Sequence, residues 1–476
     1  MLEASTQGTP LAAAPDWLDR PAVLGDDATW SWREVHEASL ELAARLEGAT
    51  AVCNLCASRL GFLVTLLAAL RRGCLLILPP SGGNAELGAV VAADRATRVV
   101  GDPPAWPEPW CDDRYLQCLP ARALQPRRDA AELAWMPVWD EVAIRLYTSG
   151  STGAPQAQPK TLGQLVLGAR ALVARLAEDI EGGVATLDRI VCSVPPQHMF
   201  GLECSVMLPL VCGLPVLDRR PLLPADVRAA FEGGPAALWV ATPMHLRSLV
   251  QENEAVPACG LAVASTMPLA PEIALGAERC LGAPVLEIYG STETGALAMR
   301  RTSQEAAWRP LEGVRLEPDT GSTIARGLHF ASPVAVPDEI APGVDGRFTL
   351  LGRHADLVKI AGRRASLAGL DRLLLDLPGI EDGAFYLPPT GRSTERLCLV
   401  YAGPPLDRNA ALSWLRERLD PVFLPRTFIR VERLPRNEGG KLRRAALARI
   451  HEAWQSSPQD AGAPIGAALP VYVAPS

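Results

Sequence analysis

The segment YTSGSTGAP, residues Tyr147 to Pro155, combines two glycines with four serine or threonine residues in nine positions. It follows the alternating apolar run VAIRL (142–146), which is typical of a strand, and precedes LGQLVLGARALVARLAEDI (162–180), whose apolar residues have helical spacing. A flexible loop between a strand and a helix can bring backbone N–H groups and hydroxyls around a phosphate. A Ser/Gly-rich surface turn would have the same composition. It is not a Walker A loop, because no Gly-Lys-Ser/Thr closes it.

Three further motifs follow: EIYGSTETG (287–295), LLGRHADLVKIAGRRASL (350–367) and LPRNEGGKLRR (434–444). In this order and with these gaps the chain resembles the adenylate-forming, or AMP-binding, superfamily. That group includes acyl- and aryl-CoA synthetases, the adenylation domains of peptide synthetases, and luciferases. The resemblance begins at about PAVLGDDATWSWREV (21–35) and reaches the lysine-bearing segment near the end. Four motifs in family order are more specific than any one of them.

The length of 476 residues predicts two or more domains. The resemblance implies a large layered α/β domain with parallel-rich sheets over residues 1–353, which binds ATP and acid. A small mobile α+β lid domain is expected over 354–456 and a flexible Pro/Ala/Gly-rich tail over 457–476. The 48% hydrophobic and 21% charged residues fit a soluble globular protein, and the net charge of −7 argues against a nucleic-acid surface or an anionic membrane.

The first hundred residues alternate strand-like and helix-like segments, which predicts layered packing with parallel strands. The most apolar stretch, residues 61–80, is broken by Arg71, Arg72 and Gly73. It therefore predicts a core helix followed by a buried strand and not a membrane span. No secretory signal is visible, so a cytoplasmic protein is expected. Residues 101–140 are expected to be a loop. The eleven cysteines are scattered, and the lone CxxC at Cys53 and Cys56 favours buried free thiols.

The resemblance implies that the loop holds ATP phosphates through residues of YTSGSTGAP, namely Thr148, Ser149, Gly150, Ser151, Thr152 and Gly153. The family usually has a lysine after the proline of this loop, and here Gln156 occupies that place. The nearest lysine is Lys160. Lys160 fits an exposed lysine at a helix start as well as it fits a phosphate contact.

The EIYGSTETG motif implies the rest of the nucleotide site. Tyr289 would stack on the adenine, with Gly290 and Ser291 next to the nucleotide, and Thr292 would donate to the α-phosphate. Glu293 would help to hold Mg²⁺, a hard cation that prefers oxygen ligands. The ribose contacts match Asp338, which follows proline where the family has glycine, and Arg353. Asp345 competes with Asp338 but lies in an Asp-Gly sequence typical of a turn.

The acid pocket is implied by three segments, VPPQHMFGLE (194–203), LWVATPMHLRSLV (238–250) and VASTMPLAPEI (263–273). The matching residues, with one from the end of EIYGSTETG, are His198, Phe200, Gly201, Trp239, Ser265, Thr266 and Gly295. His198 is expected to line the pocket and not to act as an acid or base. The bulkier Ser-Thr-Met at 265–267 replaces the family's Gly-Gly-Ala and implies a shorter or differently shaped pocket. No aspartate stands where α-amino acids are paired, although Glu203 lies nearby, so an acid without an α-amino group is expected.

The last two motifs imply a moving lid. The hinge position two residues after Arg353 is Ala355, followed by Asp356. Gly362, in a predicted hairpin, would make room for a phosphopantetheine arm. Lys441, on a Gly-flanked loop before a helix, would bridge the substrate carboxylate and the α-phosphate, where charge develops in the transition state.

The resemblance implies a ligase that uses ATP and Mg²⁺ to form an acyl-AMP, then a thioester with CoA or a carrier-protein phosphopantetheine. The chain resembles stand-alone ligases of aryl-polyene pigment pathways, which implies secondary metabolism and a hydroxybenzoate-type aryl acid. Medium-chain or 3-hydroxy fatty acids are the alternative substrates. An amino-acid adenylating enzyme and a non-catalytic nucleotide-binding protein, suggested by Gln156 and Ala355, are the alternative classes. No carrier domain is evident, so a carrier protein would be a separate partner.

Overall fold

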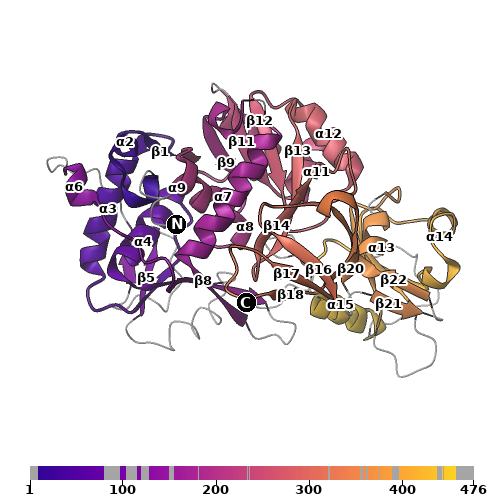
Figure 1. Cartoon of the computed structure of the whole chain (residues 1–476). Coiled ribbons are helices and arrows are strands. Elements are labelled where there is room, and N and C mark those ends of the chain that lie inside the picture. The colour runs from indigo at the N-terminus through magenta and orange to yellow at the C-terminus, as the bar shows by residue number, and fades with distance from the viewer. Residues whose placement is uncertain are drawn as a thin grey trace. The chain divides into compact units, whose positions relative to one another are not determined.

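The computed structural model describes residues 9–79, 97–102, 115–118, 128–149, 155–180, 182–232, 234, 236–319, 322–353, 357–360, 363–374, 376–388, 396–436, 442 and 444–456. The chain divides into two compact units (Figure 1). The first comprises residues 1–315 and 325–334, and the second residues 316–324 and 335–475. The functional boundary expected after Arg353 stays a prediction, and the expected tail lies outside the described residues.

A nine-stranded sheet in the first unit has the order β15-β14-β13-β12-β11-β9-β10-β1-β2. Neighbouring strands from β13 to β1 are parallel, whereas β2, β14 and β15 run antiparallel to their neighbours at the two edges. All residues of β11 are buried, as expected for a parallel strand covered on both faces. The strands are β1 (Pro21–Leu24), β2 (Thr29–Ser31), β9 (Arg189–Cys192), β10 (Val216–Leu217), β11 (Ala237–Ala241), β12 (Cys259–Ala264), β13 (Val285–Ser291), β14 (Gly295–Arg300) and β15 (Arg309–Pro310).

A six-stranded sheet in the same unit has the order β6-β5-β3-β4-β7-β8 and is parallel except for β8. Its strands are β3 (Ala51–Asn54), β4 (Leu75–Leu78), β5 (Thr97–Gly101), β6 (Tyr115–Gln117), β7 (Val142–Ser149) and β8 (Pro155–Thr161). The strand and helix predicted on either side of YTSGSTGAP are present as β7 and α7 (Leu162–Glu178). Strand β8 was not predicted; it pairs with β7 from Val142 opposite Thr161 to Ser149 opposite Pro155.

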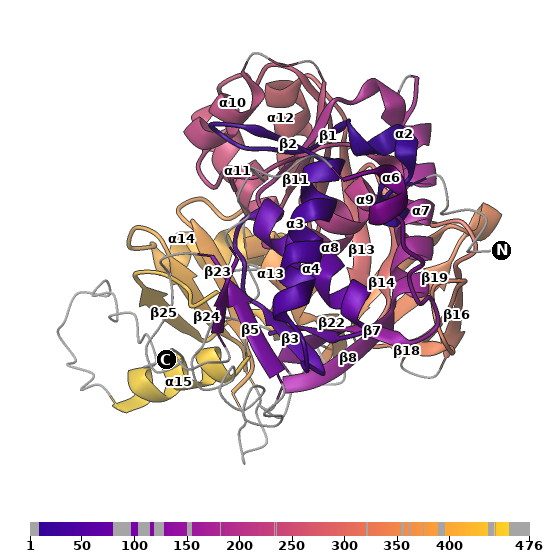
Figure 2. The same cartoon turned by 90° about the vertical axis from the view of Figure 1, so that its left-hand side faces the viewer.

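The other helices of this unit are α2 (Pro15–Leu18), α3 (Trp32–Arg45), α4 (Arg59–Arg72), α6 (Ala130–Leu133), α8 (Met199–Leu202), α9 (Leu208–Cys212), α10 (Pro224–Phe231), α11 (Pro243–Glu252) and α12 (Pro271–Leu281). Short 3-10 turns are η1 (Pro10–Ala12) and η2 (Val184–Thr186), and η3 (Glu203–Met207) is a π-helix. Helices α3 and α4 lie side by side (Figure 2). Residues 101–140, expected to be a loop, contain β6 and α6. The core helix and strand predicted over 61–80 are α4 and β4, and no described helix is long and apolar enough to cross a membrane.

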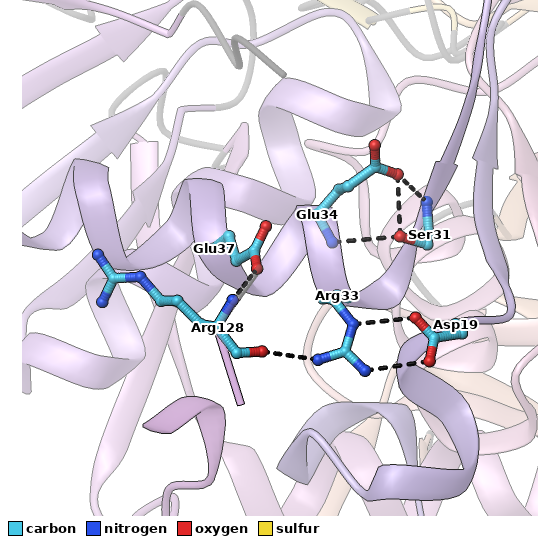
Figure 3. Close-up of polar contacts among 6 residues, drawn as sticks. All are labelled: Asp19, Ser31, Arg33, Glu34, Glu37 and Arg128. Atoms are coloured by element: carbon cyan, nitrogen blue, oxygen red, sulfur yellow. Dashed lines mark hydrogen bonds and ion pairs between the residues drawn. The ribbon is translucent and has the colours of Figure 1, made fainter. Parts of the chain in front are cut away.

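The start of α3 shows how local sequence fixes an element (Figure 3). Ser31 caps the helix by accepting the N–H of Glu34, whose carboxylate accepts the N–H of Ser31 at 2.8 Å. Arg33 donates to both oxygens of Asp19, at 2.9 and 3.0 Å, and to the carbonyl of Arg128 at 2.8 Å. The guanidinium thus joins the end of α2, the first turn of α3 and the residues before α6.

One hydrophobic core of the first unit lies between the nine-stranded sheet and helices α10, α11 and α12. It includes Phe231, Trp239, Leu246 and Leu281, which are 0–3% exposed. Cys53 and Cys56 are buried free thiols, as predicted. The parallel-rich sheets and covering helices confirm the expected α/β class.

The second unit contains shorter sheets with the orders β19-β20, β21-β22 and β23-β24-β25, and residues 315–336 form β16-β17-β18. The strands are β16 (Arg315–Asp319), β17 (Ser322–Arg326), β18 (Val334–Val336), β19 (Asp338–Pro342), β20 (Phe348–Arg353), β21 (Leu357–Ile360), β22 (Arg363–Ser366), β23 (Asp382–Tyr386), β24 (Cys398–Ala402) and β25 (Thr427–Val431). The helices are α13 (Leu367–Leu374), α14 (Arg408–Arg416) and α15 (Arg444–Ser456), with 3-10 turns η4 (Val344–Gly346) and η6 (Pro421–Phe423). Two apolar clusters on β23–β25 give this unit its own core.

Candidate active site

The turn between β13 and β14 has a shape fixed by its own side chains. Ser291 and Thr294 bond reciprocally: the N–H of Ser291 donates to the Thr294 hydroxyl at 3.2 Å, and the N–H of Thr294 donates to the Ser291 hydroxyl at 3.3 Å. A Cβ at Gly290 would lie 2.2 Å from the carbonyl oxygen of Gly295, and Gly295 has φ +72°. These positions accept only glycine without strain, so the two predicted glycines define the turn.

Thr292 and Glu293 occupy the tip of this turn and are half-buried. Among the described residues neither side chain makes a hydrogen bond with the rest of the chain. Within the described part of the chain, the Thr292 hydroxyl is available to a phosphate and the Glu293 carboxylate, which also interacts with the charge of Lys160, is available to a cation. The chemistry of Glu293 fits Mg²⁺, which often takes one or two protein carboxylates together with substrate phosphates. The described residues contain no group of three or more His, Cys, Asp or Glu that could hold a metal ion without the substrate.

Tyr289, the predicted adenine contact, is half-buried on β13 just before the turn. Its ring centroid lies 5.6 Å from that of Trp308, with the planes tilted by 55°. Arg300 covers the ring of Trp308 at 4.3 Å from the centroid. This stack on the β13–β14–β15 edge orients the Tyr289 ring.

Three buried polar side chains lie behind the turn: Lys160 on β8, Glu203 at the start of η3, and His329. They are 6%, 4% and 5% exposed. The ammonium of Lys160 donates to the carbonyl of Glu293. Glu203 Oε1 accepts the N–H of Ala296 at 3.1 Å, and His329 Nε2 donates to the carbonyl of Ala296 at 3.2 Å. The interpretation of Lys160 as an exposed lysine is therefore wrong, because β8 carries it into the interior.

Burial sets the ionisation of these groups. It raises the pKa of the Glu203 carboxyl to about 7, against the opposing effects of the Ala296 N–H and the charge of Lys160. It lowers the pKa of the Lys160 ammonium, which the charges of Glu203 and Glu293 partly restore. It lowers the pKa of His329 to about 4, so the imidazole is neutral near pH 7.

The segment 194–203, predicted to line the acid pocket, forms helix α8 and the residues that precede it. His198 is the half-buried N-cap of α8, with its carbonyl accepting the N–H of Leu202 at 2.8 Å. Phe200 and Gly201 are buried, and a Cβ at Gly201 would lie 2.0 Å from the carbonyl oxygen of Pro195. Gly201 is thus needed for the close turn before α8. Glu203, noted near this segment, begins η3 and is directed at Ala296.

The other predicted pocket residues have different surroundings. Trp239 is 0% exposed within the core against α10–α12, and its indole N–H donates to the Ser193 hydroxyl at 3.0 Å. This placement is that of a core residue and gives no support to a ligand contact. The Ser265 hydroxyl donates to the carbonyl of Ile288 at 2.9 Å, which ties its loop to β13. Thr266 is exposed and has φ +83°, a strained conformation for a β-branched residue.

In the second unit, Asp338 and Arg353 are directly opposite each other on the antiparallel strands β19 and β20. The structure therefore brings the two predicted ribose contacts together at the level of the backbone. Asp345 has φ +55° and is exposed in η4, which agrees with its interpretation as a turn residue. The strands β21 and β22 pair from Leu357 opposite Ser366 to Ile360 opposite Arg363, so the expected hairpin is present.

Several predicted residues lie outside the described part of the chain: Gly150, Ser151, Thr152, Gly153, Ala355, Gly362 and Lys441. Of Thr148 and Ser149 the structure describes the backbone alone, at the end of β7 opposite Gln156 and Pro155. The roles assigned to these residues stay predictions.

Residues 12–317 match the model of the AMP-binding enzyme family. Because the match covers more than half of the chain, the protein belongs to this family. It is 29% identical over 299 residues to the 4-coumarate–CoA ligase of Cereibacter sphaeroides, covering 62% of this chain and 69% of that one. It is 26% identical over 514 residues to the p-hydroxybenzoic acid–AMP ligase FadD22 of Mycobacterium tuberculosis, covering 96% of this chain and 70% of that one.

Solved structures confirm the fold. The o-succinylbenzoate CoA synthetase (MenE) of Bacillus subtilis, in complex with its acyl-adenylate intermediate, aligns with a TM-score of 0.77 at 18% identity, covering 92% of this chain and 97% of that one. The same synthetase in complex with ATP and magnesium ion aligns with a TM-score of 0.76 at 19% identity, covering 92% and 98%. The expected adenylate-forming architecture is thus confirmed.

Sequence reasoning missed the residues behind the turn. It left the role of Lys160 open, gave none to Glu203 and did not consider His329. No motif marks them, because they come from three separate segments and meet only in the fold. One signal was available for Glu203: an acidic residue inside the apolar run MFGLECSVMLPL (199–210) needs a buried partner.

Proposed function

We propose that this protein is an ATP-dependent carboxylic acid ligase that forms an acyl-adenylate and then a thioester. In the first step a carboxylate oxygen attacks the α-phosphorus of ATP, an O–P bond forms, and the bond to pyrophosphate breaks. In the second a thiolate attacks the acyl carbon and AMP departs with the electron pair. The observation that carries the proposal is the rigid β13–β14 turn, which leaves the Thr292 hydroxyl and the Glu293 carboxylate available.

ATP and Mg²⁺ are the proposed co-reactants. Mg²⁺ would be held by Glu293 and would offset phosphate charge when bound. Thr292 would donate to the α-phosphate, and Tyr289 would stack on the adenine. Asp338 and Arg353 would hold the ribose, and the glycine and hydroxyl groups of residues 148–153 the phosphates. Lys441 would meet the charge that develops between carboxylate and α-phosphate.

The proposed substrate is an aryl acid such as a hydroxybenzoate. Two of the relatives support this substrate class, because one is named as a ligase of 4-coumarate and the other as a ligase of p-hydroxybenzoic acid. The burial of Glu203 and the hydrogen bond from the Ala296 N–H to its Oε1 support an acid without an α-amino group, because this carboxylate is directed at the hairpin backbone. The thiol acceptor would be CoA or the phosphopantetheine of a separate carrier protein, entering past Gly362.

The proposal is tested by acid-dependent ATP–pyrophosphate exchange with hydroxybenzoates, cinnamates, fatty acids and amino acids. Strong exchange with aryl acids, weak exchange with fatty acids and none with amino acids are expected. A response to amino acids alone would contradict the substrate class. A Lys441→Ala variant should lose exchange by about 10²- to 10³-fold, the size expected for one transition-state donor. Unchanged exchange in that variant would remove the role assigned to Lys441. Incubating the wild-type acyl-adenylate with CoA or a phosphopantetheinylated carrier protein then identifies the thiol.

A further inference from the structure

The β13–β14 turn is held from behind at two backbone positions. The Lys160 ammonium binds the carbonyl of Glu293, at the tip of the turn. Glu203 and His329 bind the N–H and the carbonyl of Ala296, immediately after it. The holding side chains come from β8, η3 and residues 327–330, three segments far apart in the sequence. We call Lys160, Glu203 and His329 the clamp.

The clamp fits closely because small residues surround it. Gly295 faces the Glu203 carboxylate, and a Cβ there would lie 2.5 Å from Oε1 and 3.2 Å from Met199 Cε. On the other side, a Cβ at Gly168 of α7 would lie 3.6 Å from the same oxygen and 3.8 Å from the His329 ring. The carboxylate therefore has little freedom to move, and neither does the backbone it binds.

Burying ionisable groups lowers stability, so an ordinary turn is not expected to be held by them. Desolvating a carboxylate and an ammonium costs several kcal/mol each unless good partners offset it, and apolar packing holds backbone without that cost. Here both groups are directed at the backbone of one turn, whose tip carries the two free polar side chains of the site. Glu203 also begins the π-helix η3, a geometry frequent at functional sites. It follows the segment that carries His198 and Phe200, so it connects the acid segment with the nucleotide turn.

We propose that Lys160 and Glu203 are positioning residues for adenylate formation. Lys160 fixes the carbonyl of Glu293 and Glu203 fixes the N–H of Ala296, so Thr292 and Glu293 meet phosphate and Mg²⁺ in one geometry. Lys160 thus acts on the second nucleotide motif and not as a replacement for the missing lysine at Gln156. The inference rests on the proposed function, because it assigns the purpose of the turn. A misplacement of about 1 Å in catalytic groups can lower the rate by about 100-fold.

The test compares three clamp variants with one control. Lys160→Met and Glu203→Leu remove the polar contact, whereas Glu203→Gln keeps an oxygen that accepts the Ala296 N–H. Arg175→Met removes a different buried charge, which pairs with Asp179 at the end of α7 and does not contact the turn. The measurements are kcat and KM for Mg-ATP and for the acid in pyrophosphate exchange, the Kd of Mg-ATP by calorimetry, and the thermal midpoint. All kinetic assays are run well below the lowest midpoint.

Lys160→Met and Glu203→Leu should raise KM for Mg-ATP and lower kcat, by about 10- to 100-fold in kcat/KM. KM for the acid should change much less. Glu203→Gln should rescue most of the loss, and Arg175→Met should lower the thermal midpoint alone. A purely structural role would move the midpoints of all variants and leave the KM for Mg-ATP within twofold of the wild type. That result would overturn the proposal.

The proposed function can fail separately. If the wild type binds Mg-ATP but exchanges pyrophosphate with no acid, the ligase proposal fails. The clamp is then judged by the Kd of Mg-ATP, which should rise at least tenfold in Glu203→Leu and stay unchanged in Arg175→Met. An unchanged Kd in Glu203→Leu overturns the clamp. A wild type that does not bind Mg-ATP overturns both.

Discussion

Two buried carboxylates lie at opposite ends of the β13–β14 hairpin, and their surroundings differ. Glu287, at the end away from the turn, is saturated with partners. Its Oε2 accepts hydrogen bonds from Nε and Nη2 of Arg300, at 2.8 and 2.6 Å, and from the hydroxyl of Thr302, at 2.7 Å. Its Oε1 accepts the N–H of Leu269 at 2.9 Å. A buried charge with this many donors is fully compensated.

Glu203, at the turn end, is compensated less completely. Among the described residues it accepts one hydrogen bond, from Ala296, and is otherwise balanced by the charge of Lys160. Burial therefore raises the pKa of Glu203 to about 7. The two ends of the hairpin therefore differ in function. At the far end, Glu287 and its partners stabilise the fold, whereas at the turn the buried Glu203 and Lys160 lower stability and lie next to the proposed chemistry.

The largest effect on stability is expected for Glu287→Ala. It leaves the Arg300 guanidinium buried without its carboxylate, which should lower the free energy of unfolding by about 3–5 kcal/mol. Urea denaturation at pH 7, followed by tryptophan fluorescence, measures the loss. The double variant Glu287→Met/Arg300→Met removes both charges and should recover a large part of it. A single variant that loses under 1 kcal/mol would remove the distinction between the two ends.

The next effect is the pH dependence contributed by Glu203. Unfolded, its carboxyl titrates near 4.5, and folded near 7. The folded state therefore keeps a proton that the unfolded state has lost, and stability from this group declines as pH rises from 4.5 to 7. The decline should be about 3 kcal/mol, from 1.36 kcal/mol per pKa unit.

Glu203→Gln removes this titration, so the wild type should lose stability relative to the variant across that range. The histidines contribute equally to both proteins, so their contribution cancels in the difference between the two unfolding free energies. Burial lowers the pKa of His36, His245 and His329 to about 4, so their contribution is lost in the opposite direction, as pH falls from 6.5 to 4. A flat difference between pH 4.5 and 7.5 would show that Glu203 is ionised at its ordinary pKa.

Gly295→Ala should have a smaller effect. The substitution combines a left-handed backbone, at φ +72°, with a Cβ 2.5 Å from Glu203 Oε1. Placing alanine in the left-handed conformation lowers the unfolding free energy by about 1–2 kcal/mol. Gly48→Ala is a matched control, because Gly48 has φ +76° and no atom within 4 Å of the added Cβ. Gly295→Ala should lose more unfolding free energy than Gly48→Ala, and KM for Mg-ATP should rise in Gly295→Ala alone. Equal losses would mean that the clamp is not tightly packed.

The smallest effect is a gain. Thr266 is a β-branched residue at φ +83°, in the loop that Ser265 ties to β13. Thr266→Gly should relieve strain that is partly offset by the greater entropy of unfolded glycine, for a net increase of about 1 kcal/mol in unfolding free energy. Thr266→Ala keeps the Cβ and should gain little. Destabilisation by Thr266→Gly would show that the threonine side chain stabilises the loop.

Local patterns predicted the elements that flank the motifs. The alternation at 142–146, the helical spacing at 162–180 and the apolar run at 61–80 each depend on neighbouring residues, and β7, α7, α4 and β4 follow from them. Strand β8 was missed because PQAQPKT has two prolines and no apolar alternation. It is a strand because it pairs along β7, a contact that no local pattern records.

The candidate site divides in the same way. Gly290 and Gly295 could be predicted, because a tight hairpin turn needs residues without a Cβ where backbone approaches closely. The clamp could not, because Lys160, Glu203 and His329 meet across three segments. Trp239 shows a second limit: the resemblance assigns its segment to the acid pocket, whereas the structure packs its ring in the core beside Ala237 and Ala241, and the assigned role stays a prediction. Which face a strand residue takes depends on the sheet and not on the motif.

The most direct test of the account is pyrophosphate exchange by the wild-type protein with Mg-ATP across hydroxybenzoates, cinnamates, fatty acids and amino acids. The account predicts strong exchange with aryl acids, weak exchange with fatty acids and none with amino acids. Exchange confined to amino acids, or none with any acid while Mg-ATP still binds, would contradict it.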